Sequence, residues 1–310
     1  MLDPSALYQF ETDTDVTFLH ARTMVVAFGG YLDAGGTQRL LVDHLLSTLD
    51  HRVVATFDVD QLFDYRGRRP LMTFERDHFT AYDDPALVLY AVTDDSGTPF
   101  LLLAGREPDY QWERMIEAVQ QLMLRFGVEL VVTVYGVPMT VPHTRPLWVS
   151  AHANSEHLVE GRTPVFGTVK VPAGLQNLLE FRLGEVAKPA VGYAVHVPHY
   201  LAHADFPAAA LAGLENLAAV TGLDLPDAAL QLAAADTQRA ITAEVGENED
   251  AQPVISALEQ QYDDFIAGRQ RQALLSGDDS LIPSGDQLAE EFEQFLRQQE
   301  GDAQPKPPEH

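Results

Sequence analysis

The sequence predicts a layered α/β domain followed by an acidic, helical C-terminal region. Short apolar runs rich in β-branched residues alternate with amphipathic helical patterns over the first 224 residues. Strand-like runs are missing beyond that point, where only helical patterns and a strong excess of acidic residues remain. We therefore divide the chain into an α/β core (residues 1–224), an acidic helical region (225–300) and a disordered, proline-rich tail (301–310).

Six strands are predicted in the core by short apolar runs that end close to Gly, Pro or Asp. Because the runs are continuous rather than alternating, we expect strands that are buried on both faces. The predicted strands are Thr23–Gly29, Arg52–Asp58, Ala86–Val92, Pro99–Gly105, Val128–Gly136 and Ala190–Val197.

An amphipathic helix is predicted between the fourth and fifth of these strands. Apolar side chains recur at spacings of three and four from Trp112 to Phe126, and Gly127 ends the pattern. Glu107 and Asp109 stand at its start, where carboxylates favour the positive end of the helix dipole. The sequence therefore predicts a helix that packs one apolar face on the sheet.

Further helices are predicted by similar patterns on both sides of residue 225. A leucine stripe runs from Leu175 to Val186, and the next helix begins near Asp205, a candidate N-cap, with Pro207 in its first turn. Ser284 opens a candidate capping box for the last helix. The helical stretches of the acidic region are Asp227–Val245, Val254–Leu275 and Ser284–Gln299.

The charge of the chain limits the partners it can bind. It has 46 acidic and 20 basic side chains, a formal net charge of −26. Such a surface repels nucleic acid and anionic membranes, whose phosphates require clustered Lys and Arg. The last 87 residues hold 19 acidic and 5 basic side chains. We therefore expect no nucleic-acid or membrane partner. The C-terminal region is either a solvated helical appendage that packs on its own sheet or a surface suited to a basic protein partner.

The absence of cysteine excludes disulfides, zinc sites built on Cys and thiol nucleophiles. The N-terminus has no basic stretch followed by an apolar stretch, so we expect no secretory signal. The longest apolar runs have the length of strands and are too short to span a bilayer. The sequence therefore predicts a soluble, cytoplasmic protein.

The first strand-to-helix junction, FGGYLDAGGTQRLL, has spacing similar to that of a phosphate-binding loop. Gly30, Gly35, Gly36 and Thr37 match that spacing, but Gly36 stands where the loop needs Lys, and Asp33 adds a negative charge. Phosphate charge would go uncompensated, so we reject ATP binding. The glycines instead predict a tight turn that requires positive φ.

A dense histidine patch, HVPHYLAHADFP, raises the question of a metal site. Its histidines have the spacing of one helix face, but Pro198 and the preceding strand disrupt a helix there, and no H-E-x-x-H motif is present. We expect the strand to end by Val197, which leaves its first two histidines in a loop. No metal or cofactor is expected, although a zinc site with His143 or His152 remains an alternative. The histidines of the patch are His196, His199 and His203.

A second patch, GVPMTVPHTRP, follows the fifth strand and is stiffened by three prolines. One interpretation is a preorganised anion or carboxylate site with Arg145 as donor and His143 as partner. The other is that Arg145 pairs with Glu107 or Asp109 and joins two loops. Because both patches follow strands, we expect one loop cluster near the carboxyl ends of the sheet. Its candidate residues are His143, Arg145, His152, His196, His199, Tyr200, Glu107, Asp109 and Asp33.

Several longer motifs, taken in order, resemble one family. They are GYLDAGG, AGREPDYQWERM, YGVPMTVPHTRP, VKVPAGLQNLLEFRL, HVPHYLAHADFPAAAL and ALEQQYDDFI. From about Thr23 to Leu296 the chain resembles the actinobacterial branch of the proteasome assembly chaperone family, of its second-subunit type. The resemblance implies a phosphorylase/hydrolase-like, three-layer fold with a mixed central sheet flanked by helices. Eukaryotic members act as chaperones for proteasome α-subunits, and the family has no agreed catalytic set.

Two functions follow as hypotheses. The first is a non-catalytic interaction or assembly-chaperone-like protein, a homo-oligomer with three subunits as a working number and proteasome subunits as possible partners. The second is a phosphorylase- or hydrolase-like enzyme, or a small-ligand binder, for a nucleoside-like or anionic substrate. In that case Arg145 would hold the anion and the loop histidines would act as acid or base.

Overall fold

The computed structural model describes residues 2–12, 16–30, 33–162, 167–248 and 250–275, with side chains through residue 268. The chain forms two compact units. The first consists of Met1–Thr163 and Pro172–Glu259, and the second of Pro164–Val171 and Gln260–His310. The division predicted at residue 225 stays a prediction, and the helix expected from Ser284, its capping box and the tail lie outside the described residues.

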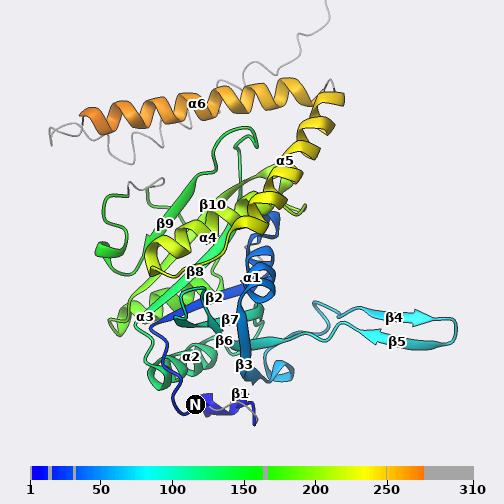
Figure 1. The fold of residues 1–310 in the computed structure, drawn as a ribbon, viewed down its shortest axis with the longest axis vertical. Helices are drawn as coiled ribbons and strands as arrows, with labels where there is room; N and C mark the ends of the chain where they lie inside the picture. Colours follow the sequence, from blue (N-terminus) through cyan, green and yellow to red (C-terminus); the bar gives the residue numbers. More distant parts are fainter. Residues whose placement is uncertain (1, 13–15, 31–32, 163–166, 249, 276–310) are drawn as a thin grey trace, which may run out of the picture. The chain divides into compact units, whose positions relative to one another are not determined.

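An eight-stranded mixed sheet forms the centre of the first unit (Figure 1). Its strand order is β1-β3-β6-β7-β2-β8-β10-β9, in which β7, β2, β8 and β10 run parallel and the other neighbours pair antiparallel. A separate two-stranded hairpin, β4–β5, is inserted between β3 and β6. The strands are β1 (Tyr8–Phe10), β2 (Thr23–Gly29), β3 (Asp50–Phe57), β4 (Met72–Glu75), β5 (His78–Tyr82), β6 (Leu87–Thr93), β7 (Pro99–Arg106), β8 (Leu130–Met139), β9 (Val149–Ala153) and β10 (Ala190–Pro198).

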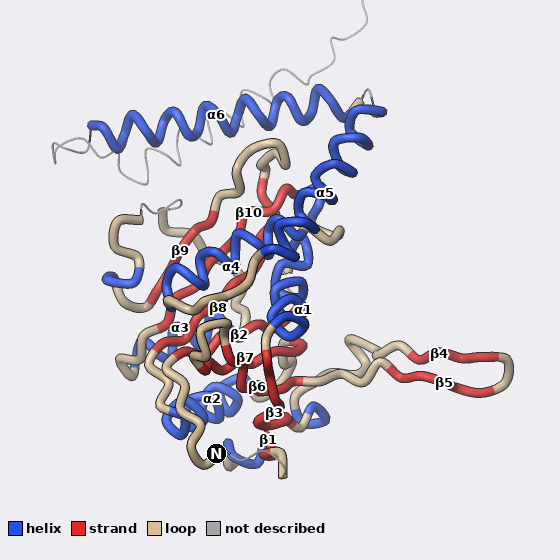
Figure 2. The backbone as a smooth tube through the Cα atoms, in the orientation of Figure 1, coloured by secondary structure: helices blue, strands red, loops and turns tan. Residues whose placement is uncertain are grey.

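Helices cover both faces of this sheet, as Figure 2 shows. Apolar side chains of α2 and α3 pack on one face, and those of α1 and α4 pack on the other. The predicted three-layer α/β class with a mixed sheet is therefore confirmed. The helices are α1 (Thr37–Thr48), α2 (Trp112–Phe126), α3 (Leu175–Glu185), α4 (Pro207–Thr221), α5 (Ala228–Glu247) and α6 (Ala251–Leu275).

All six predicted strands are present. The runs of β2 and β10 are buried on both faces as expected, whereas β3 exposes Asp50, His51, Arg52 and Thr56. Every residue of β10 is buried, as are six of the seven residues of β2. Strand β9 and the β4–β5 hairpin are not predicted by the apolar pattern. All five β9 residues are half-buried, and all residues of β4 and β5 are exposed, so neither has an apolar run that marks burial.

Helix α2 begins and ends where its apolar pattern predicts, with Gly127 at φ 72° after its last turn. Two roles predicted for carboxylates at helix N-termini are wrong, although α2 and α4 begin where the sequence places them. Asp205 does not cap α4, whose N-cap residue is Phe206, because its carboxylate pairs with Arg39 instead. Glu107 is not at the start of α2 either; its carboxylate accepts from the Leu175 N–H, at the first residue of α3, at 2.6 Å.

The turn from β2 into α1 has the left-handed backbone that its glycines predict. Gly35 and Gly36 have φ values of 68° and 60°. Strand β8 passes this turn closely at Gly136, where an added Cβ would lie 2.1 Å from the Ala34 carbonyl oxygen and 2.5 Å from Thr37 Oγ1. A glycine is therefore required in β8 for the turn to reach its place beside the strand.

The acidic helices differ in burial from the helices of the core. Helix α5 buries only Leu230 fully and exposes most of its remaining length. In the part of the chain that the structure describes, no helix combines the length and the apolar character needed to cross a bilayer.

A buried carboxylate closes the turn between β6 and β7. Asp94 accepts hydrogen bonds from the N–H groups of Ser96 at 3.0 Å and Thr98 at 2.7 Å, and from the N–H of Asp224 at 2.8 Å. Burial raises the pKa of Asp94, but these donors outweigh burial and hold the pKa below its ordinary value. The carboxylate thereby joins the turn to the segment between α4 and α5.

Asp94→Asn is therefore expected to lower the free energy of unfolding at pH 7 by about 2 kcal/mol, because the buried donors lose a charged acceptor. Urea denaturation measures the change. The exposed neighbour Asp95 provides a matched control, and Asp95→Asn should change stability by less than about 0.5 kcal/mol. Equal effects of the two substitutions would contradict this role of Asp94.

Candidate functional site

A hydrogen-bonded pair joins the two patches GVPMTVPHTRP and HVPHYLAHADFP. The N–H of His143, in the loop after β8, donates to the Tyr200 hydroxyl at 2.8 Å, and the same hydroxyl lies 2.7 Å from His143 Nδ1. Tyr200 belongs to a short 3-10 helix directly after β10. Because β8 and β10 are adjacent and parallel, their carboxyl ends bring the two loops together. His143 is buried in this contact.

Arg145 pairs with a carboxylate far away in sequence. Its Nη1 donates to Glu259 Oε1 at 3.2 Å, and the Thr144 hydroxyl donates to the same oxygen. Glu259 lies in the first half of α6. The expected alternative, in which Arg145 binds Glu107 or Asp109, is therefore wrong. The loop after β8 is fastened to the beginning of α6 instead.

His196 is a strand residue, so the prediction that it lies in a loop is wrong. Strand β10 continues to Pro198, and its backbone pairs with β8 as far as Met139. The His196 imidazole is buried, and its Nε2 lies 2.8 Å from the Ser150 hydroxyl of β9. Burial lowers the pKa of His196 from 6.5 to about 4, so the ring is neutral at physiological pH.

His152 is the middle member of a three-residue chain of hydrogen bonds. Its Nδ1 lies 3.0 Å from Glu180 Oε1 of α3, and its Nε2 lies 2.7 Å from the Tyr135 hydroxyl of β8. The ring occupies the space above Gly192 of β10, where an added Cβ would lie 2.2 Å from it. Burial raises the pKa of Tyr135 to about 12. The carboxylate therefore orients the imidazole, which accepts from a protonated phenol.

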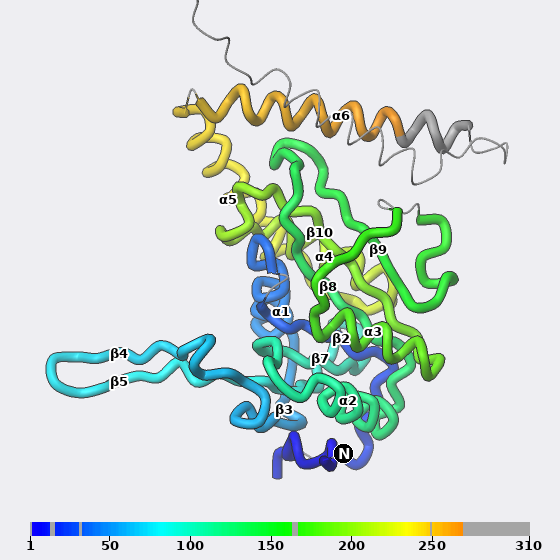
Figure 3. The backbone as a smooth tube through the Cα atoms, turned by 180° about the vertical axis from the view of Figure 1, so that it is seen from behind, coloured from blue at the N-terminus to red at the C-terminus, as the bar shows by residue number. Residues whose placement is uncertain are grey.

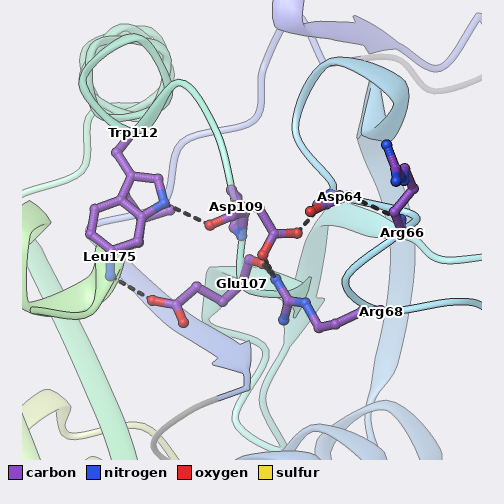
Figure 4. A network of polar contacts seen from close by, with 8 residues as sticks. Asp64, Arg66, Arg68, Glu107, Asp109, Trp112 and Leu175 are labelled. Atoms are coloured by element: carbon purple, nitrogen blue, oxygen red, sulfur yellow. Dashed lines mark hydrogen bonds and ion pairs between the residues drawn. The ribbon is translucent and has the colours of Figure 1, made fainter.

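Glu107 and Asp109 take part in a separate network at the end of β7 (Figure 4). Arg68 donates to the Glu107 carbonyl oxygen at 2.6 Å and to the Asp109 carboxylate. Asp109 also accepts from the Asp64 N–H at 2.8 Å. A cavity of about 10 Å³ lies beside this network and has at most the space of about one water. It is lined by Phe63, Asp64, Tyr65, Arg68, Pro85, Arg106 and Asp109.

The last two predicted site residues have different surroundings. Asp33 accepts from the Gln38 N–H at 2.6 Å, in the first turn of α1. Burial raises the pKa of this carboxyl above its ordinary value. His199 is exposed, with its ring beside that of Tyr200 at a centroid distance of 5.4 Å.

The structure thus divides the nine candidate residues into several local groups. It brings His143 and Tyr200 into direct contact, with Arg145 on the same loop and His199 beside Tyr200. The His196–Ser150 contact joins β10 to β9, and His152 joins β9 to Tyr135 of β8 and Glu180 of α3. Glu107 and Asp109 belong to the network at β7. Among the described residues, no group of three or more metal-ligating side chains has the geometry for an ion. The sequence missed Ser150, Tyr135, Glu180 and Glu259, because nothing in their local pattern marks them.

Burial also lowers the pKa of His143, while the Glu259 carboxylate acts in the opposite direction. The imidazole and the Tyr200 hydroxyl therefore form a neutral pair at pH 7. The Tyr200 hydroxyl also accepts a hydrogen bond from the buried N–H of His143, so the pair fixes the position of the loop after β8.

Tyr200→Phe is expected to destabilise the protein by about 1–2 kcal/mol, because the buried His143 N–H loses its acceptor. Chemical denaturation at pH 7 measures this loss. Tyr82→Phe removes a hydroxyl from an exposed tyrosine of β5 and should have no measurable effect. A neutral outcome for Tyr200→Phe would mean that this contact does not hold the loop.

Comparison with models of protein families shows which family the chain belongs to. The model for the PAC2 family matches residues 27–245, which run from the end of β2 through β10 and α4 into α5. The chain belongs to the PAC2 family. This confirms the resemblance found in the sequence motifs. A search of curated proteins found no match.

Three solved structures are similar to this chain. A protein of unknown function from Mycobacterium tuberculosis is 45% identical, with a TM-score of 0.82 over 87% of this chain and 92% of its own. One from Corynebacterium glutamicum, also of unknown function, is 39% identical, with a TM-score of 0.79 over 84% and 98%. A proteasome-assembly chaperone homologue from Mycobacterium tuberculosis is 24% identical, with a TM-score of 0.69 over 75% and 99%, which shows the fold alone.

Proposed function

We propose that this protein is an assembly-chaperone-like protein that acts by binding other protein chains. The observation that carries the proposal is the PAC2 family match across residues 27–245. A structural relative with the same fold is a proteasome-assembly chaperone homologue. Proteasome subunits are therefore the partners that we infer first.

The ionisable groups at the sheet support a binding role over the alternative anion-dependent enzyme. That enzyme needs Arg145 for its substrate, but Arg145 is bound to Glu259. His143 is likewise engaged with Tyr200. Recruiting either residue would cost the contact that holds the loop, so a substrate would have to compete with the protein's own structure.

The β4–β5 hairpin offers a surface for protein contacts. It extends from the body of the first unit in Figures 1 and 3 and pairs with no other strand of the described chain. Its register places Met72 opposite Tyr82 and Phe74 opposite Phe79. The Phe74 and Phe79 side chains stack edge to face, with 57% and 62% of their surface exposed. Exposed apolar clusters of this kind mark interaction sites.

Self-association through this hairpin is part of the proposal. An isolated two-stranded hairpin is marginally stable in water, so a partner that covers its aromatic face would stabilise it. We propose a homo-oligomer, with three subunits as the working number. The acidic α5 and α6 would remain available to a basic partner surface.

Light scattering on the full chain tests the oligomer. The double substitution Phe74→Ser/Phe79→Ser should shift the mass toward that of the monomer, whereas Thr73→Ser/Thr80→Ser on the same hairpin should leave it unchanged. Both variants should keep the circular dichroism of the wild type, because the eight-stranded sheet does not include the hairpin. A wild-type chain that is monomeric at micromolar concentration would contradict self-association.

Affinity capture from the native cytosol tests the partner. Proteasome subunits should be recovered at low salt and lost as salt rises, because charge attraction is screened. The variant Glu244→Gln/Glu247→Gln, which removes two charges of α5, should recover less. If no proteasome subunit is recovered under either condition, the proteasome role is wrong, and the light-scattering result still stands by itself.

A further inference from the structure

We propose that Ser150 is a nucleophile for acyl transfer and that His196 is its general base, with uncharged carboxylic esters as the substrate class. This activity goes beyond protein binding and uses residues outside the loop contacts of Arg145. The central observation is the distance of 2.8 Å between Ser150 Oγ and His196 Nε2. A hydroxyl within hydrogen-bond reach of an imidazole is the arrangement that activates a serine.

The register of the sheet fixes this pair. Ser150 of β9 lies opposite Ala194 of β10, and His196 lies two residues farther along β10. Because successive side chains alternate between faces, Ala194 and His196 lie on the same face. Two adjacent strands therefore fix the position of Ser150 relative to His196, and they do so more precisely than two loops would. Because Ala194 has only a methyl side chain, it leaves space beside Ser150 on this face of the sheet.

The strand edge provides access and a backbone donor. β9 is the last strand of the sheet, and its residues are half-buried. The His196 N–H bonds to the Trp148 carbonyl and the Asn154 N–H to the Ala190 carbonyl, so alternate residues of β9 face β10. By that alternation the N–H of Ala151 points to the outer edge. It follows the nucleophile directly and can donate to a developing oxyanion.

The surroundings select the charge of the substrate. Tyr135, His152 and Glu180 form the neighbouring hydrogen-bonded chain, and Glu180 is the formal charge in it. In the part of the chain that the structure describes, Tyr135, His152 and Glu180 form no hydrogen bond or ion pair with Arg or Lys. A negatively charged acyl group would be repelled by Glu180 without a compensating cation. An uncharged ester has no negative charge for Glu180 to repel and needs no compensating cation.

The proposed step conserves atoms and protons. Ser150 Oγ adds to the carbonyl carbon of the ester as its proton passes to His196 Nε2. The carbon–oxygen bond to the alcohol then breaks, and the imidazolium protonates the departing oxygen. Water attacks the acyl-serine, passes its proton to Nε2, and releases the acid as Ser150 regains its hydrogen.

An uncharged fluorophosphonate ester is the direct probe, because the serine oxygen bonds to phosphorus and fluoride leaves. Intact-protein mass spectrometry of the full chain should show one adduct, located on Ser150 by peptide mapping. The adduct should be absent from Ser150→Ala and retained by Ser155→Ala, a matched serine in the turn after β9. No adduct on the folded wild type, or an adduct that persists in Ser150→Ala, overturns the proposal.

A second measurement isolates the role of His196. The chain has 0 cysteines, so Ser150→Cys and Ser155→Cys each introduce a single thiol. At pH 7, iodoacetamide should alkylate Ser150→Cys about tenfold faster than Ser155→Cys, because the neutral imidazole of His196 can accept the thiol proton as the sulfur attacks. Adding His196→Gln should remove that advantage. Equal rates for the two thiols overturn the assignment of His196 as base, even if the phosphonate reacts.

Discussion

Gly136→Ala is expected to destabilise the protein by about 3 kcal/mol or more, because the added methyl has nowhere to go. Its Cβ would lie 2.1 Å from the Ala34 carbonyl oxygen and 2.5 Å from Thr37 Oγ1. The obstacle is the backbone of the β2–α1 turn rather than a flexible side chain. The turn must therefore move away from β8, together with the beginning of α1. Urea denaturation measures the loss.

Gly246→Ala provides the control for this prediction. Gly246 lies near the end of α5, and an added Cβ there meets nothing within 4 Å. Alanine is the better helix former, so this variant should be unchanged or more stable by up to about 1 kcal/mol. If Gly136→Ala behaves like Gly246→Ala, then β8 and the turn are not as close as the structure places them.

The stability of the protein should fall by about 3 kcal/mol on account of His196 as the pH is lowered from 7 to 4. Burial lowers the pKa of this histidine from 6.5 to about 4. Between these two pH values the histidine is protonated in the unfolded chain but neutral in the folded chain, so lowering the pH favours unfolding. The contribution is constant above about pH 6.5 and is lost progressively toward the folded pKa.

The measurement is a series of urea denaturation curves from pH 7 to pH 4. Carboxylates titrate in the same window, so the result is the difference between the wild type and His196→Gln. That difference should shrink as the pH falls, because the variant has no imidazole to protonate. His199→Gln removes an exposed histidine three residues away and should follow the wild type. Parallel curves for the wild type and His196→Gln at every pH would contradict a buried, neutral His196.

Most of the central sheet could be predicted because its strands are uniform. The run TMVVAFG is apolar at nearly every position and became β2 without a change of bounds. Strand β9 could not be predicted, because Ser150 and His152 interrupt its apolar positions and an edge strand need not be buried. The hairpin was missed for a related reason. Its aromatic residues are exposed, and an apolar pattern in the sequence indicates which residues are buried, not which strands pair with each other.

The candidate site shows a different limit of sequence reasoning. The position of both patches after strands predicts that their loops meet, and His143 does contact Tyr200 where β8 and β10 end. The partner of Arg145 could not be found that way, since Glu259 is 114 residues distant and carries no local mark. His196 lies in a strand rather than a loop because β10 continues to Pro198, and a proline pattern alone does not show where the pairing with β8 ends. Whether the candidate residues act together in function stays a prediction.

The position of the β4–β5 hairpin has an evolutionary consequence. It is inserted between β3 and β6, which are themselves neighbours in the sheet. If the hairpin were shortened to a tight connection, those two strands would still meet, and their pairing does not depend on it. Residues at its tip are therefore free to diverge, so that a lineage could change what it recognises while the architecture beneath is inherited intact.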